Sequence, residues 1–441
     1  MIWKSTLIVI LMLLPGALAL AQDEDQFQLP SPPRQEAAPL EIPPLAPHVN
    51  SYGFEVPPGW NMAMAIDALG VYDSNPAFQL QPSGDEAQRY SGNVSLTYLA
   101  QNTVYQTTYL PSFTYYRQFT TLNSANQNIS QTLWHQVDRK TSVTWRLDAA
   151  KFPSWGGSSF SNSVFGSLLM QLSGLTALNL VSKVSDATTG FTLEHKPSLR
   201  SHLQLDVSGG VTKYVHSDSN QFLSLLTSAD SSTWYGQTGL IYDYQLSAHR
   251  TLGVGVSASY FLFTAQNYHL MEQSAVLRYQ EMLGNHWSYT VSIGPQFREQ
   301  QLSSAALQPG LSLSAGVAHK TLRSSFRASV MSSYQMGQAQ GNLTTWVAST
   351  SFERSIGKRV FAGVFATYQR SQALASGPLG LGTTQTVAPA LDGGVRLSRH
   401  LVWFANYGYG LQQGVLTMQK NISRQQVVTG LSLNVDRLFP L

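Results

Sequence analysis

From Trp60 onward, apolar and polar residues alternate along the chain with a period of two. In the segment 143–149 (VTWRLDA), every odd position is apolar and every even position is polar. The segment 287–298 (WSYTVSIGPQFR) holds six apolar residues that alternate with six polar or small ones. This period is typical of β-strands whose two faces meet different environments, and it does not fit a helix. The pattern therefore predicts an all-β chain.

About eighteen segments show this alternation. We place the strands at residues 60–72, 88–99, 103–119, 128–137, 141–151, 188–195, 201–215, 232–246, 250–265, 267–283, 287–299, 309–318, 324–336, 343–354, 358–372, 384–397, 401–412 and 425–437. The connections fall into a short and a long class that largely alternate. Outer-membrane barrels show this arrangement, with short periplasmic turns, longer external loops and an even number of strands. The predicted fold is a transmembrane antiparallel up-and-down β-barrel of about 18 strands, with a range of 16–20.

A secreted β-sandwich or a β-solenoid is the alternative for an alternating chain. A sandwich of this length would need several domains, and no linker interrupts residues 60–441. A solenoid would show a repeat of fixed length, and we find none. The barrel is therefore the preferred interpretation.

The N-terminal residues have a different pattern and predict two separate segments. Residues 1–21 combine a short cationic start, an apolar run and a small-x-small cleavage site (Ala19-Leu20-Ala21), as a signal peptide does. Residues 22–59 hold nine of the 20 prolines, six acidic residues and one basic residue. Such a stretch predicts a Pro-rich periplasmic tether and not a packed domain. The barrel is expected to occupy 60–441.

Composition excludes several classes of protein. Charged residues are 12% of the chain and cysteine is absent, which rules out a disulfide scaffold, a cysteine nucleophile and a thiolate metal site. The net charge of +3 is too small to indicate nucleic acid as a partner. No G-x-S-x-G, H-E-x-x-H or P-loop motif occurs. We therefore expect no enzyme activity, no cofactor and no metal.

Charged residues occur at the polar positions of the predicted strands. If the apolar positions face lipid, these charges face a water-filled lumen, because burying them in a dry core would be very costly. Five Arg and five Asp make up the predicted pore lining. They are Asp67, Arg146, Asp148, Asp206, Asp243, Arg278, Arg298, Arg327, Asp392 and Arg396. This balance predicts weak ion selectivity and neutral or mixed solutes such as sugars.

The third predicted external loop, 152–187, is the longest connection. Its apolar residues fall at helical spacing: Val164, Phe165, Leu168, Leu169, Leu172 and Leu175. The loop resembles, in order and length, the third external loop of general porins, which folds into the barrel and narrows it. This resemblance implies a constriction built from Val164, Phe165, Leu168, Leu169 and Leu172. A helix that caps the barrel mouth or rests on the lipid surface is the alternative.

Two further resemblances bear on function. The last strand and the C-terminal Phe439-Pro440-Leu441 resemble the signal by which barrel-assembly machinery recognises outer-membrane proteins, although many of those end on an aromatic residue. The run 68–75 (ALGVYDSN) resembles the first strand and Asp-x-Asn loop of β-barrel porins found beside exopolysaccharide gene clusters. That second resemblance implies a role in passing or anchoring surface polysaccharide.

The sequence thus favours an outer-membrane channel for passive diffusion of small polar solutes. A barrel that takes part in exopolysaccharide export or anchoring is the first alternative, and a structural barrel without an open pore is the second. The expected partners are outer-membrane lipid and lipopolysaccharide, the barrel-assembly machinery, and polysaccharide or small sugars. The oligomeric state is not predicted.

Overall fold

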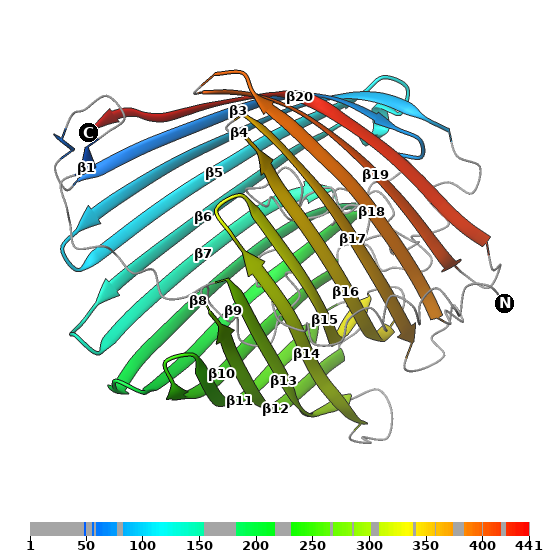
Figure 1. Ribbon diagram of the computed structural model, residues 1–441. Coiled ribbons are helices and arrows are strands. Elements are labelled where there is room, and N and C mark those ends of the chain that lie inside the picture. The colour runs from blue at the N-terminus through cyan, green and yellow to red at the C-terminus, as the bar shows by residue number, and fades with distance from the viewer. Residues whose placement is uncertain are drawn as a thin grey trace.

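The protein forms one closed barrel of eighteen antiparallel strands, β3 to β20 (Figure 1). The computed structural model describes residues 48–49, 55–56, 59–76, 83–153, 182–216, 231–264, 268–284, 286–300, 308–337, 341–357, 359–373, 383–398, 400–415 and 420–440. Each strand pairs with its neighbours in the sequence, and β20 pairs with β3 to close the wall. Among these residues, no helix is long and apolar enough to cross a membrane.

The predicted all-β barrel of 18 strands is confirmed. The strands are β3 (Trp60–Asp73), β4 (Asp85–Ala100), β5 (Thr103–Tyr116), β6 (Ser124–Gln136), β7 (Thr141–Pro153), β8 (Ser182–Ser198), β9 (Ser201–His216), β10 (Ser231–Ser247), β11 (Arg250–Phe263), β12 (Tyr268–Leu283), β13 (Trp287–Gln300), β14 (Gln308–Lys320), β15 (Ser324–Gly337), β16 (Gly341–Ile356), β17 (Val360–Ala373), β18 (Thr383–Arg396), β19 (Leu401–Val415) and β20 (Lys420–Pro440). A 3₁₀ turn, η2 (Thr120–Leu122), follows β5.

Two strands begin five or more residues earlier than the alternation indicated. β8 begins at Ser182 instead of residue 188, and β20 begins at Lys420 instead of residue 425. Their ladder partners, β9 and β19, continue to the same level and hold these extra residues in the sheet. Within the predicted tether, β1 (His48–Val49) pairs with β2 (Glu55–Val56). The division into signal peptide, tether and barrel stays a prediction.

The two faces of the wall differ as the alternation requires. On β11, the side chains of Leu252, Val254 and Val256 are exposed on one face, while Gly253 and Gly255 on the other face are buried. Exposed large apolar side chains recur in this way on most strands. Because the wall is a single sheet closed on itself, the exposed apolar face is its outer face. The alternate positions form the inner face.

Aromatic residues gather on the outer face near both ends of the strands. Trp60 contacts the rings of Tyr98 and Tyr105, with centroids 5.0 and 6.0 Å apart, next to the turn between β4 and β5. Toward the opposite end, Tyr72, Tyr115, Trp234 and Tyr260 lie within three residues of their strand ends and are exposed. This arrangement resembles the two aromatic girdles of membrane barrels.

Every connection at one end of the barrel is two to four residues long, and we call this the short-turn end. At the other end only three connections are so short: those that join β11 to β12, β15 to β16 and β19 to β20. Five turns at the short-turn end share one device: the side chain of Asp138, Ser198, Ser247, Thr321 or Ser398 accepts a hydrogen bond from the backbone N–H two residues later. Such side chains stabilise tight turns by replacing a backbone acceptor. At Asp138 the N–H of Lys140 also lowers the pKa of the carboxyl. The opposite end is the long-loop end.

Prolines inside three strands interrupt the hydrogen-bonded ladder locally. Pro111, Pro295 and Pro389 each lie within a two-residue gap in the pairing with one neighbour, while pairing with the other neighbour continues. A proline has no N–H to donate, so the gap falls on the side where that donor is missing. The ladder resumes beyond each of these gaps.

Candidate functional site: the inner face of the barrel

All ten charged residues predicted to line the pore lie at inner-face positions. On β3, Asp67 has the same parity as the buried Leu69 and Val71, and on β18 Asp392 has the parity of the buried Ala388 and Ala390. The same comparison with buried or ladder-paired neighbours places the other eight on this face. Whether they line an open pore stays a prediction.

Of these ten, Asp243 and Arg278 are brought together by the fold. They lie on β10 and β12 with Gly253 of β11 between them in the ladder. The guanidinium Nη1 of Arg278 is 3.8 Å from Oδ2 of Asp243. A Cβ at position 253 would lie 1.9 Å from Oδ1 of Asp243. The glycine therefore leaves the space through which the two charges meet across an intervening strand.

Three further members of the set, Arg298, Asp206 and Asp67, have partners outside it. Arg298 is 1% exposed, and its Nη2 lies 3.8 Å from Oε2 of Glu272, to which Gln296 also donates a hydrogen bond. Asp206 accepts hydrogen bonds from Thr192 Oγ1 at 2.7 Å and Gln204 Nε2 at 2.9 Å. Hydroxyl groups from neighbouring strands thus hold carboxylates on the inner face, as Ser91 Oγ also does for Asp67 at 3.0 Å.

The seam between the first and last barrel strands carries the most deeply buried ion pair described. Nε of Arg424 donates to both carboxylate oxygens of Asp73 at 2.9 Å, and Nη2 makes a further short contact with Oδ2. The two side chains are 1% and 0% exposed. Gln426 adds a hydrogen bond to Asp73 Oδ2 at 3.4 Å. The pair therefore ties the long-loop ends of β3 and β20 together from inside.

The residues that follow Asp73 extend this seam. The backbone N–H of Ser74 donates to the carbonyl of Gln425. In return, the backbone N–H of Gln425 donates to Ser74 Oγ at 2.7 Å. Asn75 Nδ2 donates to the carbonyl of Ser423, and Asn75 N donates to Asp73 Oδ1 at 3.1 Å. The Asp-Ser-Asn run thus has a clear local role, since it fastens the end of β3 to β20.

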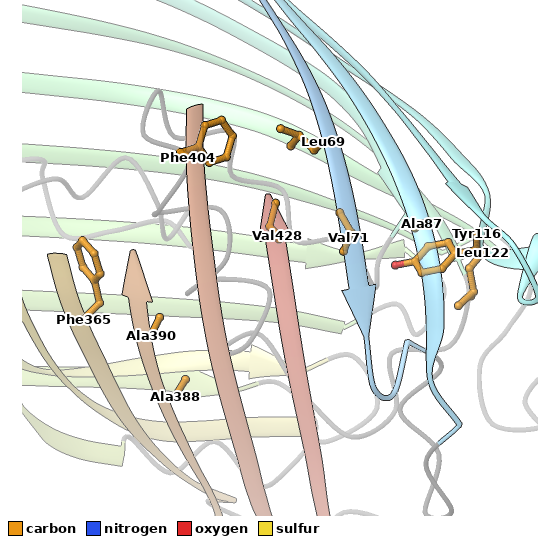
Figure 2. Packing of buried hydrophobic residues seen from close by; sticks show 10 residues of the cluster. All are labelled: Leu69, Val71, Ala87, Tyr116, Leu122, Phe365, Ala388, Ala390, Phe404 and Val428. Atoms are coloured by element: carbon orange, nitrogen blue, oxygen red, sulfur yellow. The ribbon is translucent and has the colours of Figure 1, made fainter. Parts of the chain in front are cut away.

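One arc of the inner face carries a cluster of apolar side chains, which we call the apolar arc and which differs from the expected polar lining. It covers the adjacent strands β17, β18, β19, β20, β3, β4 and β5, together with η2 (Figure 2). Its buried members are Leu69, Val71, Ala87, Tyr116, Leu122, Phe365, Ala388, Ala390, Phe404 and Val428. The same strands also carry charged inner-face residues, namely Asp67, Asp73, Asp392, Arg396 and Arg424. The apolar cluster therefore lies among charged groups and does not occupy a separate sector of the inner face.

Several charged inner-face residues were not among those predicted from the sequence. Asp186 and Arg424 lie in the extra residues by which β8 and β20 exceed their predicted bounds. Glu272 lies inside a predicted strand. It is six residues before Arg278, an even spacing that places both side chains on the same face of the strand, and this spacing could have identified it. The apolar arc also had a signal, because residues 66–72 (IDALGVY) are mostly apolar at both parities, as in strands covered on both faces.

The predicted constriction falls outside the described residues. β7 ends at Pro153 and β8 begins at Ser182, so Val164, Phe165, Leu168, Leu169 and Leu172 all lie between the described strands. Their role stays a prediction. Within the described part of the chain, no group of three or more His, Asp or Glu side chains is placed to hold a metal ion.

No protein-family model and no curated protein matches the chain. Solved structures with a similar barrel include the FrpB iron transporter of Neisseria meningitidis, with a TM-score of 0.49 and 9% identity over 85% of this chain and 81% of that chain. OccK2 (OpdF) of Pseudomonas aeruginosa gives 0.45 and 9% over 85% and 98%. The outer membrane protein OpdK of the same organism gives 0.44 and 10% over 85% and 99%.

These likenesses concern barrel architecture only. At such identities and scores they carry no argument about solutes or mechanism. The resemblance of residues 68–75 to porins found beside exopolysaccharide gene clusters stays a prediction.

Proposed function

We propose that this protein is an outer-membrane channel through which small polar solutes diffuse passively. The observation that carries the proposal is the inversion of the two faces: large apolar side chains cover the outside of the barrel, and ion pairs and hydrogen-bonded carboxylates lie inside. A soluble barrel would have the opposite arrangement. Membrane barrels of about this strand number enclose an aqueous path unless something plugs them.

The chemistry of the inner face suggests neutral solutes with many hydroxyl groups. The carboxylates of Asp67, Asp206, Asp243 and Glu272 are engaged by Ser, Thr, Gln or Arg side chains, and the described wall carries no long run of one charge. Hydroxyl and amide groups exchange hydrogen bonds readily with a passing sugar. In this proposal, the ten charged residues that the sequence predicts as pore lining, Asp67 to Arg396, are in contact with the passing solute.

Swelling of liposomes tests the solute class. Residues 22–441 are refolded into vesicles loaded with a large polymer and diluted into isotonic sugars of increasing size. The proposal expects rapid swelling in small neutral sugars, slower swelling as size increases, and little difference between neutral, anionic and cationic solutes of equal size. Vesicles with correctly folded barrels that do not swell in any sugar contradict it.

The constriction proposal has its own test. Deleting residues 160–183 removes the apolar segment that contains Val164, Phe165, Leu168, Leu169 and Leu172, and keeps most of β7 and β8. If the segment narrows the barrel, larger sugars should then enter at rates close to those of small ones. An unchanged size limit in a folded deletion variant rejects the constriction role and favours a helix on the rim or lipid surface.

A polysaccharide role ranks second because its motif has another explanation. Asp73, Ser74 and Asn75 are engaged with β20 at the seam, which accounts for this run without a polymer. Loss of surface polysaccharide in a deletion strain, together with vesicles that do not swell, would reverse the ranking. A barrel without an open pore should show neither effect.

A further inference from the structure

The backbone pairing between β14 and β15 stops short of the long-loop end of the two strands. The two strands pair from Lys320↔Ser325 to Leu313↔Ser332 and no further. On their other sides both strands continue, since β14 pairs with β13 to Gln308↔Arg298 and β15 pairs with β16 to Gly337↔Gly341. Unlike the gaps at the three interior prolines, this one is not followed by renewed pairing. It therefore opens toward the long loops.

The backbone at this gap shows which polar groups lose their partners. Lys320 N donates to His286 O on the β13 side, so in an antiparallel ladder the odd-numbered residues of β14 direct their N–H and C=O toward β15. Leu311 and Pro309 are the next odd residues beyond the last pair. Pro309 has no N–H, and the carbonyl of Leu311 accepts a hydrogen bond from Ser332 Oγ at 3.5 Å.

These two residues fit an edge that is meant to stay open. Proline is found on strand edges where the missing donor would face away from a neighbour, and it discourages a further strand from pairing there. A side-chain hydroxyl replaces one backbone donor at the point where the strands separate. Backbone groups left open to hydrocarbon are strongly unfavourable, so the gap needs water or a hydrogen-bonding ligand.

The side chains of β14, β15 and β16 around the gap are uncharged, and Arg298, which faces Gln308 from β13, is paired with Glu272. Residues 308–319 and 328–350 contain no Asp, Glu, Lys or Arg. On the inner face, β14 presents Gly310, Ser312, Ser314 and Gly316. On the outer face, Leu311 is 49% exposed and Trp346, opposite Ser332 on β16, is 39% exposed. A ligand here meets hydroxyl and backbone groups on one side and apolar side chains on the other.

We propose that this gap is a lateral opening through which an uncharged, hydroxyl-bearing amphiphile, such as a monoacylglycerol, passes between the barrel interior and the surrounding bilayer. Its polar end is expected to bind the open backbone edge and the Ser side chains, and its acyl chain to lie against Leu311 and Trp346. The inference rests on the proposed membrane position of the barrel, and not on the passage of water-soluble solutes through it.

Cross-linking tests the geometry, because the chain has no cysteine of its own. The last pair between β14 and β15 is Leu313↔Ser332, so Ser312 and Ser333 would be opposite each other if the pairing continued by one residue. Ser314↔Met331, which is paired, is the matched control. A disulfide needs Cα atoms about 4.4–6.8 Å apart. The variant S314C/M331C should oxidise readily, whereas S312C/S333C should not, yet should be joined by a longer bifunctional maleimide. Equal oxidation of both pairs overturns the opening.

Photolabelling tests the ligand. A monoacylglycerol with a diazirine at its glycerol end is irradiated in vesicles that contain the protein, and the labelled residues are identified by mass spectrometry. Label is expected on inner-face residues of β14 near Ser312. Joining S312C/S333C with the maleimide should lower this labelling about tenfold, or by about 1.4 kcal/mol of apparent binding. The disulfide in S314C/M331C should leave it unchanged.

The outcomes separate this inference from the channel proposal. Label that is confined to outer-face residues such as Leu311, or that is insensitive to the maleimide bridge, overturns the lateral opening even if vesicles swell in sugars. Labelling that the bridge abolishes, in vesicles that do not swell, supports the opening and contradicts the channel. Disulfide-linked dimers of the single variant S312C would instead show that a second copy occupies the gap, which also overturns the inference.

Discussion

At the seam, two residues far apart in sequence complete the barrel from inside. Arg424 and Asp73 are separated by 351 positions and are almost fully buried against each other. Removing one member of a buried pair leaves the other charge without its partner, which costs much more than the pair itself contributes. The variant R424A should therefore lose about 3–5 kcal/mol of unfolding free energy, as measured by denaturant titration of the refolded barrel.

The surface pair Arg117–Glu86 supplies the control for that experiment. Its side chains are 77% and 70% exposed and lie 3.4 Å apart. Exposed pairs contribute at most about 1 kcal/mol, so R117A should change the unfolding free energy little. Equal losses in R424A and R117A would contradict a structural role for the buried pair.

Gly253 offers a second prediction at the scale of single residues. Any side chain there would meet Asp243 and push it away from Arg278. We expect G253V to cost about 1–3 kcal/mol, as overpacking does. Gly236, on the neighbouring strand β10, has open space around its Cβ position. G236V should therefore stay within about 0.5 kcal/mol of the parent. Matching titration curves for the two variants would disprove the steric argument.

A strand presents neighbouring residues to opposite environments, and β6 allows a matched test of this. Ile129 is exposed on the outer face and Ser130 pairs with Asp148 on the inner face. An arginine near the middle of a lipid-facing strand costs about 2–4 kcal/mol, whereas one in a wet interior costs little. In lipid vesicles I129R should therefore be much less stable than S130R. The reverse order would contradict the assignment of the two faces.

The strands were predictable because alternation reports directly that two faces differ. All eighteen follow from it, and so does the inner-face position of residues such as Arg278 and Asp392. Strand ends were less predictable, since β8 and β20 continue only because their neighbours do. Asp186 and Arg424 were missed for that reason. Periodicity also does not report what touches across strands, so the Asp243–Gly253–Arg278 row required the register.

Over the whole molecule, the inner face combines charged and hydrogen-bonding side chains with an apolar cluster. The sequence indicated the charged positions, and the apolar run 66–72 marks one strand of the cluster only, because Leu69, Val71, Phe404 and Val428 come together when β20 closes onto β3. Closure also creates the Asp73–Arg424 contact. A local sequence pattern is enough to predict the fold class. It does not predict contacts that form only when the first and last strands of the 18-stranded sheet pair with each other.

The measurement that tests the account most directly is the single-channel conductance of refolded residues 22–441 in a planar bilayer. An outer-membrane channel with balanced inner charges should give stable, stepwise currents with a reversal potential close to zero in a salt gradient. It should also conduct more after deletion of residues 160–183. A correctly folded barrel that inserts into the bilayer and passes no current, with or without the deletion, would contradict the channel proposal.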